Sequence, residues 1–364
     1  MNRLYIWGAG KFGEYLKKKI DNYYTETVEV LGFIDSVKQG SYLDVPIVEL
    51  KEIEYAANIV IAIGNLNDVS DIYLRLKREG RKNVYWYSMH EVNGIKCDNF
   101  LKNECIFMES LGEDILPHLE FHISDKCNLN CKGCTHFSPL FHEIGDSYKI
   151  RMGELRKLLS KISNIMKLDI LGGEPLLNPE LGKYIKGIRT LLPDTCVDVF
   201  TNGLLVPQMK PELLQCIKEN NVFMSISEYK PTHDMREQII TKLEEYQIPY
   251  YISQYDRKQV FNRPISLSEH SKYPQCCISN GCVTIGNGSI ARCPTLMYIT
   301  KFNEVFHTQL PSEGIISLED PIRGRELLDL LRKDVPLCRH CIKCDMKWDV
   351  CRGKECLEDF AVFD

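Results

Sequence analysis

The sequence predicts an α/β protein of three domains, and three observations support that fold class. Apolar runs of strand length alternate with helical patterns across residues 119–268, as in a parallel sheet or barrel. A Gly8-x-Gly10-x-x-Gly13 turn follows a short apolar strand at the start of the chain. Residues 269–364 hold nine of the 16 cysteines, which indicates a module built around metal or redox centres. With 364 residues the chain can form two or three separate cores.

Composition and charge exclude several classes of partner. The net charge is −5 and the basic residues are dispersed, so the chain has no electrostatic footprint for nucleic acid. The longest apolar runs, such as Ile59–Ile63, are far too short to span a bilayer, and the N-terminus lacks a signal-peptide core. We therefore expect a cytoplasmic protein without a membrane partner, whose clustered cysteines serve metal or redox centres rather than disulfides.

Residues 1–92 have the pattern of a nucleotide-binding α/β unit. The glycines Gly8, Gly10 and Gly13 would let the backbone approach a phosphate at a helix N-terminus, and Asp35 would hold a ribose hydroxyl. The alternative is that the glycines only make a tight turn and bind no ligand. The predicted elements are a strand over 4–7, a helix with Phe12, Leu16 and Ile20 on one face, and strands over 28–34 and 58–64.

A connector over residues 93–118 is expected to lead into a central segment of alternating elements, residues 119–268. The predicted strands cover 119–124, 167–171, 197–200, 222–227 and 250–254. The predicted helices are a stripe of Leu155, Leu158, Leu159, Ile162 and Ile165, followed by 179–192, 211–220 and 235–246. Polar motifs follow several of these strands, an arrangement typical of barrels whose active residues lie at the C-terminal strand ends.

The most informative stretch is Cys127-Asn-Leu-Asn-Cys131-Lys-Gly-Cys134, directly after the strand that ends at Ser124. Cysteine thiolates are the protein ligands of iron–sulfur clusters. A cubane cluster has four irons, so a loop of three cysteines leaves one iron open to a small molecule. Half of a zinc site is the alternative, because C-x2-C spacing is also a zinc unit.

This stretch resembles the signature of the radical S-adenosylmethionine (SAM) superfamily, C-x3-C-x-aromatic-C. The resemblance implies that Cys127, Cys131 and Cys134 bind a catalytic 4Fe–4S cluster whose open iron is chelated by SAM. One electron from such a cluster cleaves SAM to methionine and a 5′-deoxyadenosyl radical, which takes hydrogen from substrate. The sequence departs at Gly133, where the family usually has an aromatic residue beside the adenine, and we expect His136 or Phe137 to fill that space.

A second match is Gly172-Gly173-Glu174-Pro175, which resembles the element that holds the SAM amino group. Two glycines expose backbone at a strand end, and Glu174 can accept from an ammonium. The resemblance also implies roles at SAM for Asn202 and for Ser225 or Ser227, although strand serines are often only satisfied core groups. The implied fold for 119–268 is a partial (β/α)6 radical SAM barrel.

The segment 269–364 looks like the auxiliary-cluster module of radical SAM enzymes, called SPASM with two clusters and twitch with one. Its first part offers Cys276, Cys282 and Cys293 to one 4Fe–4S cluster. The second part departs from the usual C-x2-C-x5-C-x3-C order, and we expect it to complete the first cluster and to hold a second. One auxiliary cluster and a zinc ribbon are the alternatives. The thiols of the second part are Cys338, Cys341, Cys344, Cys351 and Cys356.

Residues 1–92 also look like the Rossmann-like domain that precedes some sugar-modifying enzymes of glycan pathways, on the strength of Gly32-Phe33-Ile34-Asp35 and residues 58–64. We therefore expect radical epimerisation or oxidation of a carbohydrate or nucleotide sugar, with a reducing donor such as flavodoxin or ferredoxin. Cys277 is the candidate hydrogen-atom donor for epimerisation; an inert thiol or alternate ligand is the other interpretation. The alternatives are a peptide or protein maturase and a non-catalytic iron–sulfur scaffold.

Overall fold

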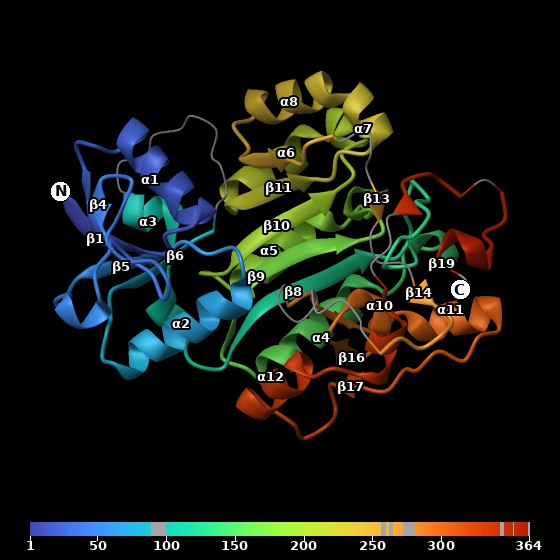
Figure 1. The fold of residues 1–364 in the computed structure, drawn as a ribbon. Coiled ribbons are helices and arrows are strands. Elements are labelled where there is room, and N and C mark those ends of the chain that lie inside the picture. The colour runs from blue at the N-terminus through green and yellow to red at the C-terminus, as the bar shows by residue number, and fades with distance from the viewer. Residues whose placement is uncertain are drawn as a thin grey trace.

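The fold is organised by two β-sheets whose strands are mainly parallel (Figure 1). The structure is a computed structural model, and it describes residues 1–88, 100–255, 260–261, 265–271, 281–342, 346–351 and 353–362. One sheet belongs to the N-terminal part, and the other runs through the centre of the molecule. In the parts of the chain that are described, no helix has both the length and the apolar character needed to cross a bilayer.

The N-terminal sheet has the strand order β2-β1-β5-β6-β7, in which the first four strands are parallel and β7 is antiparallel to β6. The predicted strand over 28–34 is confirmed residue for residue. Strand β7 and helix α3 come from the span expected as a connector. The elements are β1 (Asn2–Trp7), α1 (Lys11–Tyr23), β2 (Val28–Ile34), the hairpin β3 (Ser41–Tyr42) and β4 (Val45–Pro46), β5 (Asn58–Ile61), α2 (Leu66–Arg78), β6 (Val84–Tyr87), α3 (Phe100–Glu104) and β7 (Cys105–Phe107).

The predicted apolar face of α1 is wrong at Phe12. Leu16 and Ile20 are buried in the N-terminal core, whereas Phe12 is 37% exposed. Helix α1 begins at Lys11, so Phe12 lies in its first turn, where the ring covers Gly64 instead of the sheet. A side chain at Gly64 would place its Cβ only 2.3 Å from that ring, which explains the glycine.

The central sheet has the order β12-β11-β10-β9-β8-β15-β16-β17. Strands β8 to β12 are neighbours in both sequence and space, and each is parallel to the next. A sixth parallel strand, β15, pairs with the other side of β8 and comes from beyond the predicted boundary at residue 268. The bounds are β8 (Ile115–Ser124), β9 (Asn164–Gly172), β10 (Cys196–Thr201), β11 (Val222–Ile226), β12 (Tyr250–Ile252), β15 (Val283–Gly286), β16 (Ser289–Ala291) and β17 (Ile316–Ser317).

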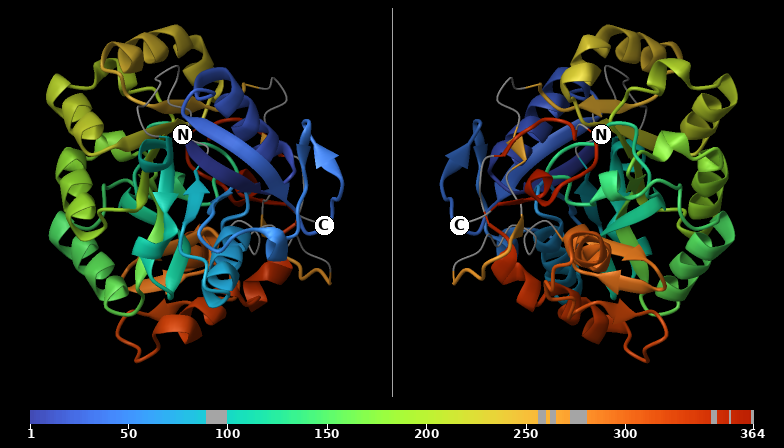
Figure 2. Two further views of the ribbon diagram at one scale, coloured as in Figure 1. Left: turned by 90° about the vertical axis from the view of Figure 1, so that its left-hand side faces the viewer. Right: turned by 90° about the vertical axis from the view of Figure 1, so that its right-hand side faces the viewer.

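Helices α4, α5, α6 and α8 form an arc around one side of this sheet (Figure 2). The predicted stripe does not continue as one helix, because α4 ends at Leu159 and Ile165 lies on β9. Isoleucine suits a fully buried parallel strand as well as a helix face, so periodicity alone misplaced it. The helices are α4 (Tyr148–Leu159), α5 (Leu181–Leu191), α6 (Pro211–Glu219), α7 (Lys230–Asp234) and α8 (Arg236–Glu245).

The N-terminal part lies at the start of the central strands, and most of the C-terminal elements lie at their other end (Figure 1). Ile115 and Met166, at the start of β8 and β9, pack into the N-terminal core. The C-terminal elements are α10 (Pro294–Met297), α11 (Ile299–Phe306), α12 (Gly324–Arg332) and two small sheets, β13 (Val260–Phe261) with β18 (Met346–Lys347) and β14 (Ile265–Ser266) with β19 (Ala361–Val362). Among these, helix α12 is the exception, because its Arg332 pairs with Asp71 of α2 over 2.9 Å.

Candidate functional site

The three cysteines of the central motif lie on the loop that follows β8 at the C-terminal end of the sheet. Cys131 is buried, and Cys127 and Cys134 are partly buried. Two residues with positive φ make the loop turn, Asn130 at +51° and Gly133 at +68°. Position 133 therefore favours glycine, because a bulky residue would be strained in this left-handed conformation. This explains why the sequence has no aromatic residue there.

The two residues expected to replace that aromatic lie in different surroundings. Phe137 is buried in the C-terminal core, where its ring packs against Phe302 and Phe360. His136 lies against His122 and hydrogen-bonds with the Cys134 thiol. Tyr229 and Trp348 are two further aromatic side chains near the thiols, and their rings stack with centroids 5.5 Å apart. Burial, and then the nearby thiols of all three cysteines, raise the pKa of Tyr229.

The C-terminal segment forms hydrogen bonds with the cysteine loop through its backbone and through one indole. The Lys132 amide donates to the Asp349 carbonyl over 2.9 Å, and the Cys351 amide donates to the Asn130 carbonyl over 2.8 Å. The Trp348 Nε1–H donates to the Cys131 Sγ over 3.2 Å. Hydrogen bonds to cysteine sulfur are one of the means by which proteins set the potential of iron–sulfur clusters.

Gly172 and Gly173 lie at the end of β9, where the cysteine loop passes directly over them. A Cβ on Gly172 would lie 2.0 Å from the Ser124 carbonyl oxygen, and one on Gly173 would lie 2.3 Å from the Lys126 oxygen. Gly172 also has φ +144°, which disfavours other residues. The two glycines therefore permit close contact between β9 and the loop.

Glu174 is hydrogen-bonded to groups of the chain itself. Its side chain is fully buried and accepts from the Thr201 hydroxyl (2.7 Å), the Asn202 amide (2.9 Å) and the Leu176 amide (3.0 Å). Three of its acceptor positions are thus used to tie the end of β9 to the end of β10. Burial raises its pKa to about 7 despite these bonds.

The structure brings Asn202 to the cysteine loop and places the two serines on and just after β11. The Asn202 Nδ2 donates to the Asn128 Oδ1 over 2.7 Å and lies 3.8 Å from the Cys127 Sγ. Ser225 is buried on β11 and donates to Asp198 over 3.1 Å, so it is a satisfied core group. Ser227 lies at the strand end, where its carbonyl accepts from the Tyr229 amide.

Comparison with known protein families matches residues 120–248 to the 4Fe-4S single cluster domain. The GTP 3′,8-cyclase of Clostridium acetobutylicum is 34% identical over 100 residues, which cover 27% of this chain and 31% of that protein. The S-adenosylmethionine-dependent nucleotide dehydratase of Flammeovirga pacifica is 27% identical over 95 residues, which cover 25% and 32%. The central segment of this chain is therefore similar to radical SAM proteins.

These similarities support a 4Fe–4S cluster and SAM as the cofactors. The matched segments span about a third of the length of these curated relatives. Among solved structures, BtrN in complex with AdoMet and 2-DOIA has a TM-score of 0.36 and 14% identity, over 62% of this chain and 92% of that chain. The anSMEcpe structure with bound AdoMet and Cp18Cys peptide has a TM-score of 0.30 and 18% identity, over 37% and 42%.

The structure describes only some of the candidate auxiliary cysteines. Cys276, Cys277 and Cys344 lie outside the described residues. Among the others, the Cys293 sulfur accepts from the Leu296 amide at the start of α10. Cys356 is exposed and donates to Asp359. The remaining described thiols are Cys282, Cys338, Cys341 and Cys351, all of intermediate exposure.

The glycine motif of the N-terminal part forms a real turn beside a small cavity. The Ala9 amide already donates to the Asp35 Oδ2 over 2.9 Å, and a Cβ on Gly13 would lie 1.8 Å from the Gly8 oxygen. Asp35, Asp68 and Asp71 all line the 260 Å³ cavity. A phosphate in this cavity would face three carboxylates, which is electrostatically unfavourable.

The glycine turn is also far from the cysteine loop. Strand β8 has ten residues, about 30 Å at 3.3 Å per residue, with the N-terminal core at its start and the cysteine loop beyond its end. The N-terminal cavity and the thiols thus belong to different ends of the central sheet. One small molecule cannot contact both in this arrangement.

Sequence reasoning missed the polar residues that line one face of the central sheet. His118 Nε2 lies 2.6 Å from the Asp169 Oδ2, and Lys167 Nζ lies 3.0 Å from Asp169 and 3.1 Å from Asp198. The partner charges of Asp169 and Asp198 outweigh burial and raise the pKa of Lys167. The signal was present in β8, where His118, Glu120, His122 and Ser124 alternate with apolar residues.

Proposed function

We propose that this chain is a radical SAM enzyme that abstracts a hydrogen atom from a carbohydrate or nucleotide-type small molecule. The observation that carries this proposal is the juxtaposition of the cysteine loop with a sheet face lined by charged side chains. Side chains on this face include His118, Glu120, Asp169 and Asp198. Carboxylate and imidazole groups bind hydroxyl groups better than they bind apolar surfaces.

We assign Cys127, Cys131 and Cys134 to the cluster, and the donor set fits that role. An amide or indole N–H lies near two of the sulfurs, from Asn202 and Trp348, and compensates thiolate charge. When bound, SAM supplies a 5′-deoxyadenosyl radical after one-electron reduction by the cluster. With the Glu174 carboxylate engaged elsewhere, the carbonyl groups of Gly172 and Gly173 are our candidates for holding the SAM ammonium.

Two observations support a carbohydrate or nucleotide-type substrate: the polar face of the central sheet and the names of the relatives. Two of the proteins that match the central segment are a GTP 3′,8-cyclase and a nucleotide dehydratase. The N-terminal glycine turn no longer supports the sugar assignment, because it lies at the other end of β8. Its binding of a nucleotide through Gly8, Gly10, Gly13 and Asp35 remains a separate prediction.

The cysteines of the C-terminal segment determine whether the reaction is an epimerisation or an oxidation. Epimerisation needs a hydrogen donor, for which Cys277 is the candidate, whereas oxidation passes an electron to an auxiliary cluster. We retain one or two auxiliary clusters on the cysteines from Cys276 to Cys356, and a flavodoxin- or ferredoxin-like electron donor. A peptide maturase is the second candidate function, and a scaffold without catalysis is the third.

The test is anaerobic release of 5′-deoxyadenosine with SAM and dithionite, across nucleotides, nucleotide sugars and peptides, in deuterated water. One nucleotide or sugar should raise release above the background without substrate. Deuterium on a product carbon would favour epimerisation. Stimulation by a peptide alone would replace the sugar proposal with the maturase.

A further inference from the structure

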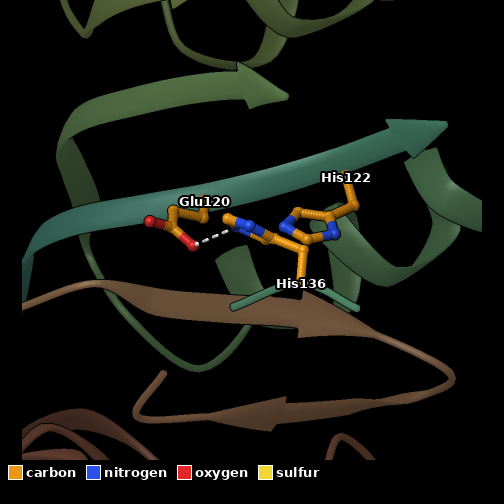
Figure 3. Close-up of side chains that lie close together, drawn as sticks. All are labelled: Glu120, His122 and His136. Atoms are coloured by element: carbon orange, nitrogen blue, oxygen red, sulfur yellow. Dashed lines mark hydrogen bonds and ion pairs between the residues drawn. The ribbon is translucent and has the colours of Figure 1, made fainter. Parts of the chain in front are cut away.

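A group of nitrogen and oxygen ligands lies beside the thiols, and one of its members, His136, also hydrogen-bonds with the Cys134 thiol. Glu120 and His122 come from β8, and His136 comes from the cysteine loop (Figure 3). One ligand atom from each lies within 4.8 Å of the other two. Among the described residues this is the single group of three metal-ligating side chains that are so close together.

The distances between the ligand atoms of these three side chains suit one metal ion after small side-chain movements. Four-coordinate zinc with bonds of 2.0–2.1 Å has ligand atoms about 3.4 Å apart. The Glu120 Oε2 and the His136 Nε2 are already 3.4 Å apart. The His122 ring stands next to the His136 ring, with centroids 4.8 Å apart, and completes the triangle (Figure 3).

The second nitrogen of His122 carries the strongest indication that a ligand is missing. The residue is 1% exposed, and its Nε2 has no hydrogen-bond partner among the described residues. Its Nδ1 lies 2.6 Å from the Tyr298 hydroxyl, which fixes the ring. A buried, unpaired ring nitrogen costs free energy that a metal–ligand bond would recover.

Each of the other two side chains also has a partner of the kind that orients metal ligands. The Thr284 hydroxyl donates to the Glu120 Oε2 over 3.1 Å. The Thr135 hydroxyl lies 3.5 Å from the His136 Nδ1, and the His136 ring also hydrogen-bonds with the Cys134 thiol. Metal-binding histidines usually hold their ring orientation through a hydrogen bond of the second nitrogen. The nearby cation Arg151 is paired with Asp125, Asp146 and Glu154 and does not leave an uncompensated positive charge.

We propose that Glu120, His122 and His136 bind one divalent transition-metal ion of the zinc or ferrous class, separate from the iron–sulfur clusters. Two imidazoles and one carboxylate are the donor set of catalytic zinc and of non-haem ferrous sites. Three protein ligands leave at least one coordination position open. That position accepts an oxygen of a small molecule, and occupancy of the site by metal does not depend on the proposed function.

Zinc K-edge X-ray absorption of the holoprotein tests the site, because the cluster iron does not contribute at this edge. The protein is reconstituted anaerobically with iron and sulfide, incubated with one equivalent of Zn²⁺ and desalted. We expect one zinc per chain with only nitrogen and oxygen neighbours at about 2.0–2.1 Å. Zinc lost on desalting, or a sulfur shell at about 2.3 Å, would overturn the proposal.

Variants supply a second, independent readout. His122→Gln and Glu120→Gln should each lose the zinc while they keep the iron content, and His118→Gln should retain it as the matched histidine control on the same strand. Tyr298→Phe should weaken zinc affinity by about 10- to 100-fold without removing a ligand. If His122→Gln fails to fold, Tyr298→Phe still tests whether His122 binds zinc. Zinc affinity that is unchanged in both Tyr298→Phe and Glu120→Gln would contradict the proposed site.

Discussion

The indole N–H of Trp348 points at the sulfur of Cys131 from a segment more than 200 residues further along the chain, at 3.2 Å. Such a bond stabilises the more negative, reduced state of a cluster held by that sulfur. We predict that Trp348→Phe lowers the reduction potential of the catalytic cluster by tens of millivolts. An EPR-monitored redox titration measures this, with Tyr229→Phe as a control that keeps the ring stack. Identical potentials in wild type and Trp348→Phe would show that the indole does not act on the cluster.

A methyl group at Gly172 should disrupt the junction between β9 and the cysteine loop. The new Cβ would lie 2.0 Å from the Ser124 oxygen, at a backbone φ of +144°. We expect Gly172→Ala to lose on the order of 3 kcal/mol of stability and most of its cluster iron. The matched control is Gly153→Ala on helix α4, where nothing lies within 4 Å and alanine should stabilise the helix by about 1 kcal/mol. Equal iron content in the two variants would contradict the packing argument.

The buried Glu174 should make stability depend on pH. Burial raises its folded-state pKa to about 7, above the unfolded value of about 4.3. The folded state therefore binds more protons between these two values, and the contribution of this group to stability falls as the pH rises through that window. The difference amounts to about 3 kcal/mol.

Unfolding by guanidinium at pH 5 and pH 8, under anaerobic conditions, measures this effect. Glu174→Gln should lose less stability than the wild type between the two pH values, because it cannot ionise. Glu245→Gln, at an exposed position of α8, should behave like the wild type. Parallel losses in wild type and Glu174→Gln would show that the carboxyl has an ordinary pKa.

Removing the cation from the polar sheet face should be costly. Lys167 lies within 3.1 Å of Asp169 and Asp198, which are both buried. Lys167→Met would leave two uncompensated carboxylates and should destabilise the fold by about 3–5 kcal/mol. Lys183→Met breaks an exposed ion pair with Glu180 and should cost at most about 1 kcal/mol. Thermal unfolding compares Lys167→Met with Lys183→Met, and similar melting temperatures would contradict this prediction.

Much of the fold was predictable because single elements carry strong local signals. The strand over 28–34 and the helix that begins at Pro211 follow from apolar runs, a helix-starting proline and turn residues. The sixth parallel strand was not predictable, because Val283–Gly286 follows Cys282 and pairs with β8 across a long separation in sequence. Local patterns do not encode which strands pair.

In the candidate site, too, local features were predictable from the sequence and contacts between distant segments were not. The cysteine spacing and the paired glycines were readable because they reflect a tight loop and a close backbone contact. The hydrogen bonds of Glu174 were not predictable, because its partners Thr201 and Asn202 come from the end of the next strand. Trp348 was missed because nothing in the sequence links it to Cys131. The alternating polar residues of β8 were visible, but only the sheet order shows what they face.

The most direct test of the central claim, that the loop of Cys127, Cys131 and Cys134 holds the cluster that cleaves SAM, is one anaerobic assay. Wild type and Cys131→Ala are reconstituted with iron and sulfide, reduced with dithionite and incubated with SAM, and 5′-deoxyadenosine is quantified by mass spectrometry. The wild type should form 5′-deoxyadenosine, and Cys131→Ala should form none above the protein-free control. No product from a cluster-replete wild type, or equal product from Cys131→Ala, would contradict the assignment.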